Sequence, residues 1–203
     1  EDYSFLNIVR YLSFRSGAAL ITSLSIVFIF APKIIYWLKA NQKEGQPIRE
    51  DGPAWHVEMK RGTPTMGGVV FIATTIIATL LTAKLNNYYV GGALLLIALF
   101  CLIGIKDDWS KITKNKNSAG LSAKAKLVLQ VFASLAVVYV LYMYNHTTTL
   151  QAPFYKNPLL DMGYYSIAFW VIVMVAASNA VNMTDGLDGL ATVPSIMAFF
   201  SLS

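Results

Sequence analysis

The stretch that decides the fold is YYVGGALLLIALFCLIGI, residues 88–105, which contains no charged side chain. A helix needs roughly 20 apolar residues to cross the hydrocarbon core of a membrane, and this run is too long and unbroken for a strand. Because lipid offers no partners for backbone N–H and C=O groups, a crossing segment must satisfy them internally, as a helix does. Other uncharged or nearly uncharged runs occur at Gly17–Leu38, Met66–Ala83, Leu127–Tyr144 and Tyr164–Val181. We therefore predict an all-α, polytopic membrane protein with five complete transmembrane helices.

The two ends of the chain extend this prediction. A sixth apolar run begins near Leu190 and reaches Ser203, which is too short to cross a membrane. We interpret residues 1–203 as a single, truncated transmembrane domain, the N-terminal part of a larger protein. Glu1 and Asp2 precede the first apolar residues, whereas a secretory signal peptide begins with basic residues and ends in a cleavage site. We therefore expect the N-terminal stretch to be an amphipathic lead-in.

The composition also argues against an ordinary soluble domain. The chain is 56% hydrophobic and 13% charged, whereas about a quarter of the residues of a soluble domain are charged. Cys101 is the only cysteine, so a disulfide within the chain is excluded.

The net charge of +5 has two interpretations. Either the basic residues set topology and contact anionic lipids, or they also attract a polyanionic substrate. No nucleic-acid partner is expected.

Lysine and arginine are concentrated in alternate loops, which predicts the topology. The first and third loops hold most of the basic residues, namely Lys39, Lys43, Arg49, Lys60, Arg61, Lys106, Lys111, Lys114, Lys116, Lys124 and Lys126. The second and fourth loops hold one each, Lys84 and Lys156. By the positive-inside rule, the N-terminus is outside and the cytoplasmic loops lie at about 39–65, 106–124 and 182–189. All three polar motifs of the chain therefore share the cytoplasmic face.

The first motif is GQPIREDGPAWHVEMKRGTPTMGG, residues 45–68. Its glycines and prolines indicate a loop, and such a loop brings backbone N–H groups and hydroxyls close to a phosphate or sugar. The alternative is a tight turn in which Thr63 or Thr65 caps the next helix. The loop also holds three basic candidates, His56, Lys60 and Arg61.

The second motif is GIKDDWSK, residues 104–111, where Asp107 and Asp108 follow the third apolar run. Two adjacent carboxylates need a cation nearby. Either Lys106 or Lys111 supplies it, or Mg²⁺ is bound together with substrate phosphates. Adjacent residues on a helix point about 100° apart, so we expect the two aspartates to have different roles.

The third motif, NAVNMTDGLDGLATVP, follows the fifth apolar run and begins at residue 179. Asn182, Asp185 and Asp188 are three residues apart, so they form a polar stripe if the helix continues through them. Ionisable groups at a membrane margin are costly unless they face a cavity or a partner. The neighbouring glycines leave room for a flat group to approach the backbone.

With GTPTMGG, KDDW and NAVNMTDGLDGLA in this order, the chain resembles the phospho-N-acetylmuramoyl-pentapeptide transferases of bacterial cell-wall synthesis. The resemblance covers essentially all 203 residues. It implies a ten-helix enzyme of the bacterial inner membrane, with both termini outside. It also implies transfer of phospho-N-acetylmuramoyl-pentapeptide from its UDP carrier to undecaprenyl phosphate, which gives lipid I and UMP with the aid of Mg²⁺. The resemblance leaves a homodimer open.

The resemblance also implies roles for individual residues. Asp107 is similar to the carboxylate that takes the remaining proton from the lipid phosphate, and Asp108 to its neighbour in or near the metal shell. The sugar side and the uracil side of the pocket are implied for Thr65, Asn182 and Asp185, and for Gly186, Leu187 and Asp188, respectively. Lys60, or Arg61 beside it, resembles the nucleotide-contacting lysine. The family's third aspartate and histidine-rich loop lie downstream, so we expect residues 1–203 alone to be inactive.

Three other interpretations remain open from the sequence. A related enzyme that transfers N-acetylglucosamine-1-phosphate to the same lipid would share Asp107 and Asp108. An ion-coupled transporter would place charges near the bilayer midplane, where the five runs have only Lys33. A structural membrane protein would not require polar motifs in three loops of one face. For the transferase, direct attack by the lipid phosphate is preferred over a covalent phospho-enzyme because the nucleophile is already anionic.

Overall fold

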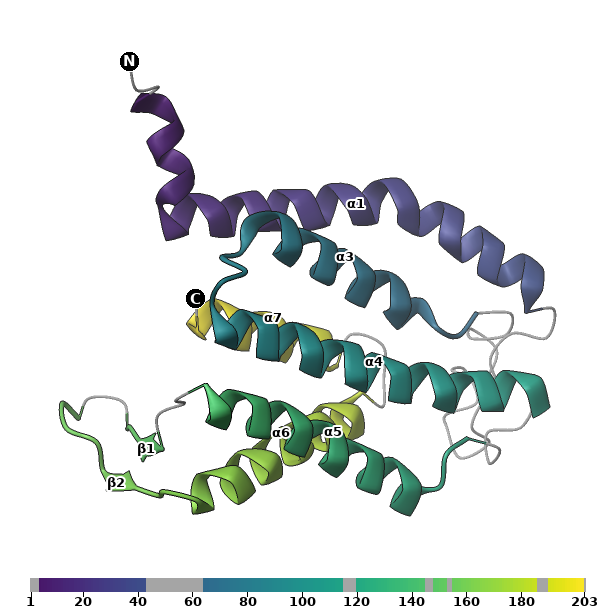
Figure 1. Ribbon diagram of the computed structural model, residues 1–203. Helices are drawn as coiled ribbons and strands as arrows, with labels where there is room; N and C mark the ends of the chain where they lie inside the picture. The colour runs from purple at the N-terminus through teal and green to yellow at the C-terminus, as the bar shows by residue number, and fades with distance from the viewer. Residues whose placement is uncertain are drawn as a thin grey trace. The chain divides into compact units, whose positions relative to one another are not determined.

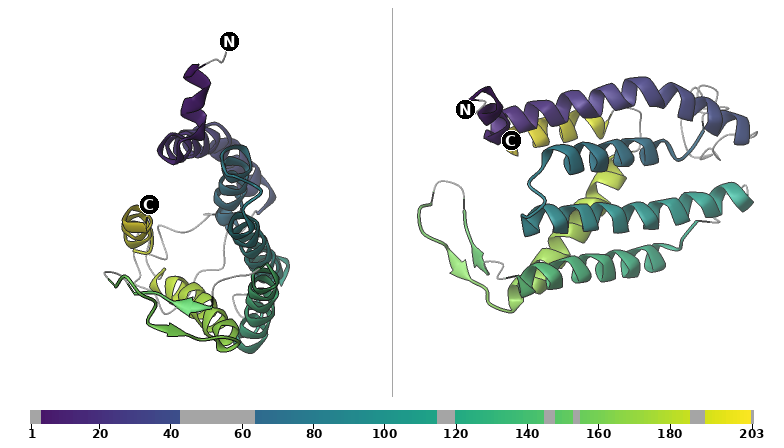
Figure 2. Two further views of the ribbon diagram at one scale, coloured as in Figure 1. Left: turned by 60° about the vertical axis from the view of Figure 1, so that its left-hand side comes forward. Right: turned by 45° about the horizontal axis from the view of Figure 1, so that its top comes forward.

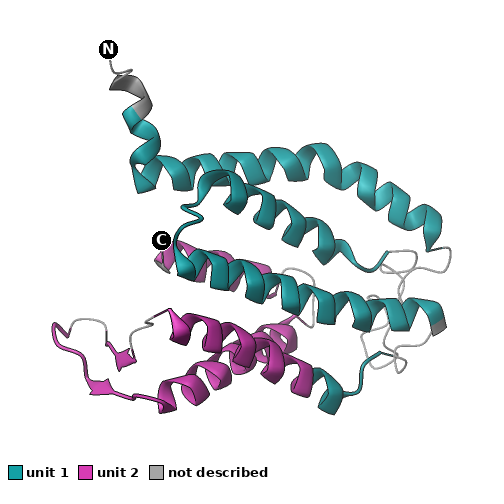
Figure 3. Cartoon of the chain, in the orientation of Figure 1, with its two compact units in different colours: residues 1–126 teal, residues 127–203 magenta. Residues whose placement is uncertain are grey.

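A computed structural model describes residues 4–42, 64–114, 120–144, 148–152, 155–185 and 190–202. The chain divides into two compact units, residues 1–126 and 127–203, which Figure 3 shows in different colours. The elements in chain order are η1 (Ser4–Arg10), α1 (Leu12–Asn41), α3 (Gly67–Thr82), α4 (Tyr88–Lys114), α5 (Ala123–Met143), β1 (Thr149–Leu150), β2 (Leu160–Asp161), α6 (Tyr165–Thr184) and α7 (Thr192–Leu202).

Each of the five predicted apolar runs forms a helix, which confirms the all-α membrane fold. Among the described residues, α1, α4, α5 and α6 are long and apolar enough to cross a membrane. The second predicted span forms a helix of 16 residues, α3. Such a helix is only about 24 Å long, which is less than the roughly 30 Å of a membrane's hydrocarbon core. Helix α3 begins after Met66, whose φ of 71° is left-handed, and ends before the extended Ala83.

Two helices continue beyond the points where the sequence predicts the apolar spans to end. The third loop was expected to begin at residue 106, but α4 continues to Lys114, so its last two turns carry the aspartate motif. The loop expected at 182–189 also starts late, because α6 continues through Thr184. In both helices the polar residues extend the helix beyond the apolar run, since backbone hydrogen bonding does not stop where hydrophobicity does.

In the first unit, α3 packs against both α1 and α4 and lies between them in Figures 1 and 2. Val70, Thr74 and Ala78 of α3 are buried. They are four residues apart and therefore lie on one side of the helix. Their small side chains let neighbouring helix backbones approach closely, as is common in membrane helix packing.

An arginine joins α1 to the end of α3. The Nε–H of Arg15 donates a hydrogen bond to the backbone oxygen of Thr82, at 2.5 Å. The last carbonyls of a helix have no partner within the helix, and a positive charge there is favourable because that end of the helix dipole is negative. Arg15 therefore fixes the end of α3 against α1.

In the second unit, α5 contacts α6 through an apolar core and a polar group. Val138, Val171 and Val175 form the core, with Ile167, Trp170 and Met174 packed around it. Asn179 lies one turn after Val175 in α6. Its amide donates hydrogen bonds to Gln130 Oε1 and to the Val175 backbone oxygen, both at 2.8 Å. Such interhelical hydrogen bonds help to hold membrane helices together.

A short hairpin, not foreseen in the sequence, lies between α5 and α6. β1 and β2 pair antiparallel, with Thr149 opposite Asp161 and Leu150 opposite Leu160. The turn that leads into α6 contains Gly163 at φ 49°, a conformation that glycine adopts without steric cost. With two residues in each strand, the hairpin leaves the fold class unchanged.

Candidate active site

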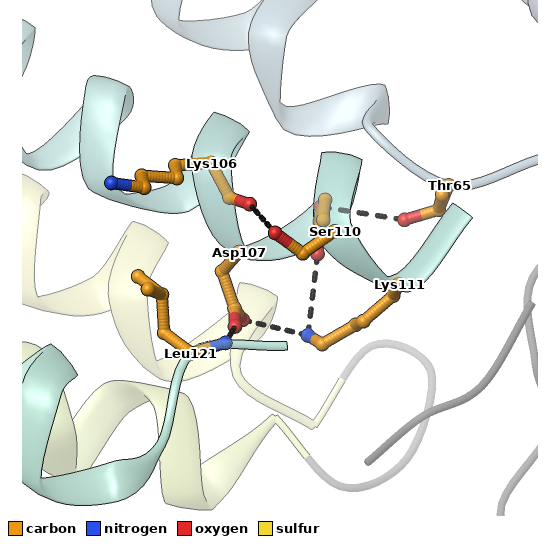
Figure 4. A network of polar contacts seen from close by, with 7 residues as sticks. Thr65, Lys106, Asp107, Ser110, Lys111 and Leu121 are labelled. Carbon is orange, nitrogen blue, oxygen red and sulfur yellow. Dashed lines mark hydrogen bonds and ion pairs between the residues drawn. The ribbon is translucent and has the colours of Figure 1, made fainter. Parts of the chain in front are cut away.

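The last turns of α4 bring three charged side chains together. Asp107 and Lys111 are four residues apart and Asp108 and Lys111 three apart, so both aspartates face the same lysine along the helix. The Lys111 ammonium lies 2.7 Å from Asp107 Oδ2 and 3.4 Å from Asp108 Oδ1. Of the two lysines considered from the sequence, Lys111 therefore balances the carboxylates, whereas the Lys106 side chain points away from the pair (Figure 4).

Asp107 is held from two sides. Its Oδ2 accepts from Lys111, and its Oδ1 accepts from the backbone N–H of Leu121 at 2.7 Å. The Asp107 side chain is only 13% exposed. Because each oxygen has a short bond to a different donor, the plane of this carboxylate is fixed.

Asp108 is held more loosely and joins a second motif. Its Oδ2 accepts a hydrogen bond from the Thr65 hydroxyl at 3.3 Å, and its side chain is 33% exposed. The two aspartates thus have different partners, apart from the shared Lys111.

Thr65 is itself fixed by a glutamine at the end of α1. The Thr65 N–H donates to Gln42 Oε1 at 2.9 Å, and the Gln42 amide donates to the Thr65 oxygen at 3.3 Å. Met66, and not Thr65, is the N-cap of α3, and no side chain caps that end. The alternative of a capping Thr65 was therefore wrong, while Thr63 lies outside the described residues.

Two cavities adjoin this cluster at the same ends of the helices. Asp108 is the one charged residue lining a cavity of about 120 Å³, whose walls include Gly68, Phe100 and Gly104. A larger cavity of about 350 Å³ is lined mostly by apolar side chains, among them Trp37, Leu38, Val69, Trp109 and Ile112. Met66 and Val69 line both cavities. Asp108 thus lines the smaller cavity directly, and the larger apolar cavity adjoins it through Met66 and Val69.

The cluster has the donor types that Mg²⁺ prefers. This cation commonly binds one or two carboxylates together with substrate phosphates. Asp108 fits that role better than Asp107, because its hydrogen bonds are long and it lines a cavity, whereas both oxygens of Asp107 have short bonds. Within the described part of the chain, no three His, Cys, Asp or Glu side chains gather into a complete metal site.

The remaining predicted site residues belong to the second unit or lie outside the described residues. Asn182 lies in the last turn of α6 and Asp185 is its C-cap, and both are exposed within the second unit. The helix ends at Thr184, so the predicted helical stripe does not continue through Asp188 as a part of α6. The others lie outside the described residues, namely His56, Lys60, Arg61, Gly186, Leu187 and Asp188.

Sequence reasoning missed two partners in the cluster. Gln42 precedes the first motif, and nothing in its immediate neighbours distinguishes it from a surface residue. Leu121 contributes its backbone N–H, a group that nearly every residue carries, so no sequence signal marks it. Both contacts depend on segments that are distant along the chain.

Comparison of the sequence with known proteins identifies its family. Residues 90–203, more than half of the chain, match the sequence profile of glycosyl transferase family 4. The chain belongs to glycosyl transferase family 4. This family 4 chain also matches the phospho-N-acetylmuramoyl-pentapeptide-transferase signature 1 over residues 60–72, which include Thr65. The family match covers both aspartates of α4 and the whole third motif.

Three relatives of this chain share the same protein name. The chain is 54% identical over 198 residues to the phospho-N-acetylmuramoyl-pentapeptide-transferase of Aliarcobacter butzleri, covering 98% of this chain and 56% of that protein. It is 50% identical over 202 residues to that of Wolinella succinogenes, covering 100% and 56%. It is 49% identical over 199 residues to that of Sulfurimonas denitrificans, covering 98% and 56%. The chain thus spans about half the length of the curated relatives it matches.

Proposed function

We propose that the whole protein transfers phospho-N-acetylmuramoyl-pentapeptide from UDP-N-acetylmuramoyl-pentapeptide to undecaprenyl phosphate, giving lipid I and UMP. The observation that carries the proposal is the hydrogen bond between Thr65 and Asp108. It joins the GTPTMGG motif, which lies in the transferase signature, to the KDDW motif of α4. The relatives at about 50% identity bear the name of this enzyme.

The reaction exchanges one phosphate partner for another. An oxygen of the lipid phosphate attacks the phosphorus attached to the sugar, a new P–O bond forms, and the bond to UMP breaks. A phosphate monoester has a second pKa of about 6, so the lipid phosphate has largely lost its second proton at neutral pH. The protein must therefore mainly align two anions and neutralise the charge that develops.

The cluster on α4 suits these tasks. Lys111 supplies a positive charge for phosphate oxygens, and Asp107 holds that lysine in place. Asp107 retains unused lone pairs that accept the remaining proton of the lipid phosphate. Asp108 would hold Mg²⁺, whose chemical contribution when bound is to neutralise phosphate charge. The apolar cavity of about 350 Å³ nearby supports a substrate with a hydrocarbon chain.

The proposal also includes the other sequence-based assignments. Thr65, Asn182 and Asp185 contact the sugar side, and Gly186, Leu187 and Asp188 contact uracil, together with Lys60 or Arg61. The enzyme is placed in the bacterial inner membrane with its N-terminus outside and this site on the cytoplasmic face, which the distribution of Lys and Arg supports. Residues 1–203 alone are expected to be inactive, because they span 56% of the relatives' length.

The test is UMP release by the full-length protein in detergent with Mg²⁺ and both substrates. Wild-type protein should need both substrates, Asp107→Asn should lose about 100-fold or more, and Thr65→Val should lose about tenfold. Thr65→Ser keeps the hydroxyl and should retain most activity. Use of UDP-N-acetylglucosamine in place of the muramoyl donor would favour the sister transferase, and use of neither donor would refute the proposal.

A further inference from the structure

Gly120 lies unusually close to the charged cluster. A Cβ atom built on Gly120 would be 2.5 Å from Asp107 Oδ1 and 2.7 Å from Lys111 Cε. Real Cβ atoms essentially never approach heavy atoms to under 3.0 Å. By contrast, a Cβ on Gly91 or Gly104 of α4 would meet nothing within 4 Å. A side chain at position 120 would therefore force Asp107 or Lys111 to move.

The restriction at position 120 comes from space and not from backbone conformation. Gly120 is absent from the residues with positive φ, so an alanine would fit its backbone angles. What would not fit is the methyl group, which would need about 1 Å more room to reach ordinary contact with Asp107. The atoms it meets are the ends of flexible side chains, so those side chains would move while the backbone stays folded.

The close approach has a visible consequence at Asp107. The residue after Gly120 donates its backbone N–H to Asp107 Oδ1 at 2.7 Å. Lys111 holds the other oxygen at 2.7 Å. The chain therefore reaches the carboxylate with a backbone donor from one side while the lysine holds it from the other, as Figure 4 shows for Leu121 and Lys111.

We propose that Gly120 is a positioning residue for the transfer reaction, and that it acts through Asp107 by letting the Leu121 N–H reach Oδ1. This inference rests on the proposed function. It goes beyond the family motifs, because Gly120 is part of none of the three. A methyl group at residue 120 displaces the Asp107 carboxylate or the Lys111 ammonium, and misplacement by about 1 Å can cost a reaction about 100-fold.

The experiment compares Gly120→Ala with Gly91→Ala in the full-length protein. Gly91 is a matched control, because it lies in α4 and has open space around it. In Gly120→Ala we expect kcat for UMP release to fall about 10- to 100-fold. The KM for each substrate should change less than about threefold, because an interaction that positions reacting groups affects kcat more than uniform binding. Gly91→Ala should match wild type in both parameters.

A second readout is independent of activity. Hydrogen exchange of the Leu121 amide, followed by NMR in protein labelled with ¹⁵N-leucine, reports the bond to Asp107 directly. We expect slow exchange in wild type and in Gly91→Ala, and faster exchange in Gly120→Ala and in Asp107→Ala. Leu121→Pro removes the donor without adding a methyl group at residue 120, so it should lower kcat by a similar factor even if Gly120→Ala does not fold.

The outcomes separate this inference from the proposed function. Wild-type protein that releases no UMP overturns the proposed function, and with it the role of Gly120 in that reaction. If wild type is active while Gly120→Ala keeps its kcat, the inference alone is wrong. It is also wrong if Leu121 exchanges at the same rate in both proteins. A purely structural role predicts that kcat and the unfolding midpoint fall while both KM values rise, and that result would overturn the inference as well.

Discussion

At the scale of single residues, one ammonium group serves two carboxylates. Lys111 is 2.7 Å from Asp107 and 3.4 Å from Asp108, so the three side chains together carry one net negative charge. The remaining negative charge favours the binding of one further cation, and the lysine can also interact with an incoming phosphate. The shared lysine therefore offsets one of the two adjacent negative charges.

Lys111→Met should lower UMP release by about 100-fold, because it removes a preorganised positive charge and leaves two adjacent carboxylates without it. The free energy of unfolding should fall by about 1 kcal/mol or less, since these ion pairs are partly exposed to solvent. Steady-state kinetics and thermal unfolding in detergent measure the two effects. Lys106→Met is the control, and equal losses in both variants would argue against a specific role for Lys111.

At the scale of elements, contacts at helix ends determine how the first unit is assembled. Gln42 at the end of α1 binds Thr65 just before α3. Near the opposite end of α3, Arg15 of α1 binds the Thr82 carbonyl. Each contact satisfies backbone groups at or beside a helix end, where the helix itself provides no partner. Together they fix α3 to α1, and α3 in turn positions Thr65 near α4.

Arg15→Met should reduce the free energy of unfolding by about 0.5–1 kcal/mol, because a positive charge and a donor are lost at the C-terminal end of α3. Arg10→Met, in η1, controls for the loss of one positive charge in the same region. Thermal unfolding of both variants in detergent measures the difference. Equal stability of the two variants would show that the bond to Thr82 contributes little.

The hairpin between α5 and α6 has a titratable contact. The Thr148 hydroxyl and the Gly163 N–H donate to Asp161 and hold the pKa of its carboxyl below the ordinary value of 3.8. Because the pKa of Asp161 is lower in the folded state, the two hydrogen bonds to its carboxylate stabilise the fold at pH values above the ordinary pKa. This stabilisation is lost as the pH falls through the folded pKa.

Thr148→Val should therefore raise the pKa of Asp161 toward its ordinary value, because the first donor is removed. NMR titration of the Asp161 carboxyl carbon measures the shift. Thr149→Val changes a neighbouring threonine in β1 and should leave the pKa of Asp161 nearly unchanged. An unaltered titration in Thr148→Val would mean that the hydroxyl does not stabilise the carboxylate.

At the scale of the whole molecule, the distribution of basic residues predicts on which side of the membrane each connection lies. Apolar helices alternate with connections that differ in charge. Lysines accumulate at and after the end of α4 that carries the cluster, whereas Lys156 is the one Lys or Arg between α5 and α6. Positively charged loops tend to remain in the cytoplasm. This asymmetry predicts opposite sides for the two regions.

The sidedness prediction is tested with single cysteines in a cysteine-free version of the full-length protein. Tyr155→Cys, in the hairpin, should react with a membrane-impermeant maleimide added to intact cells. Thr113→Cys, near the end of α4, should react only after the membrane is permeabilised. Both side chains are exposed in the structure, so accessibility reports the side of the membrane, and the reverse pattern would contradict the proposed orientation.

The sequence by itself determined the helical membrane fold, the five apolar helices and the importance of Thr65, Asp107 and Asp108 as candidates. These properties are local, because a long apolar run in lipid must form a helix and a motif is read from neighbouring residues. It also identified Lys111 as one of two possible partners for the aspartates, since residues three and four apart meet on a helix.

Only the tertiary structure decided which groups meet across the chain. It paired Gln42 with Thr65, and it brought Gly120 and the Leu121 N–H to Asp107. The physical reason is that these contacts depend on the packing of α1, α3 and α4 and on backbone donors that every residue except proline carries. Spacing along the sequence cannot distinguish one such donor from another, whereas their positions in the fold do.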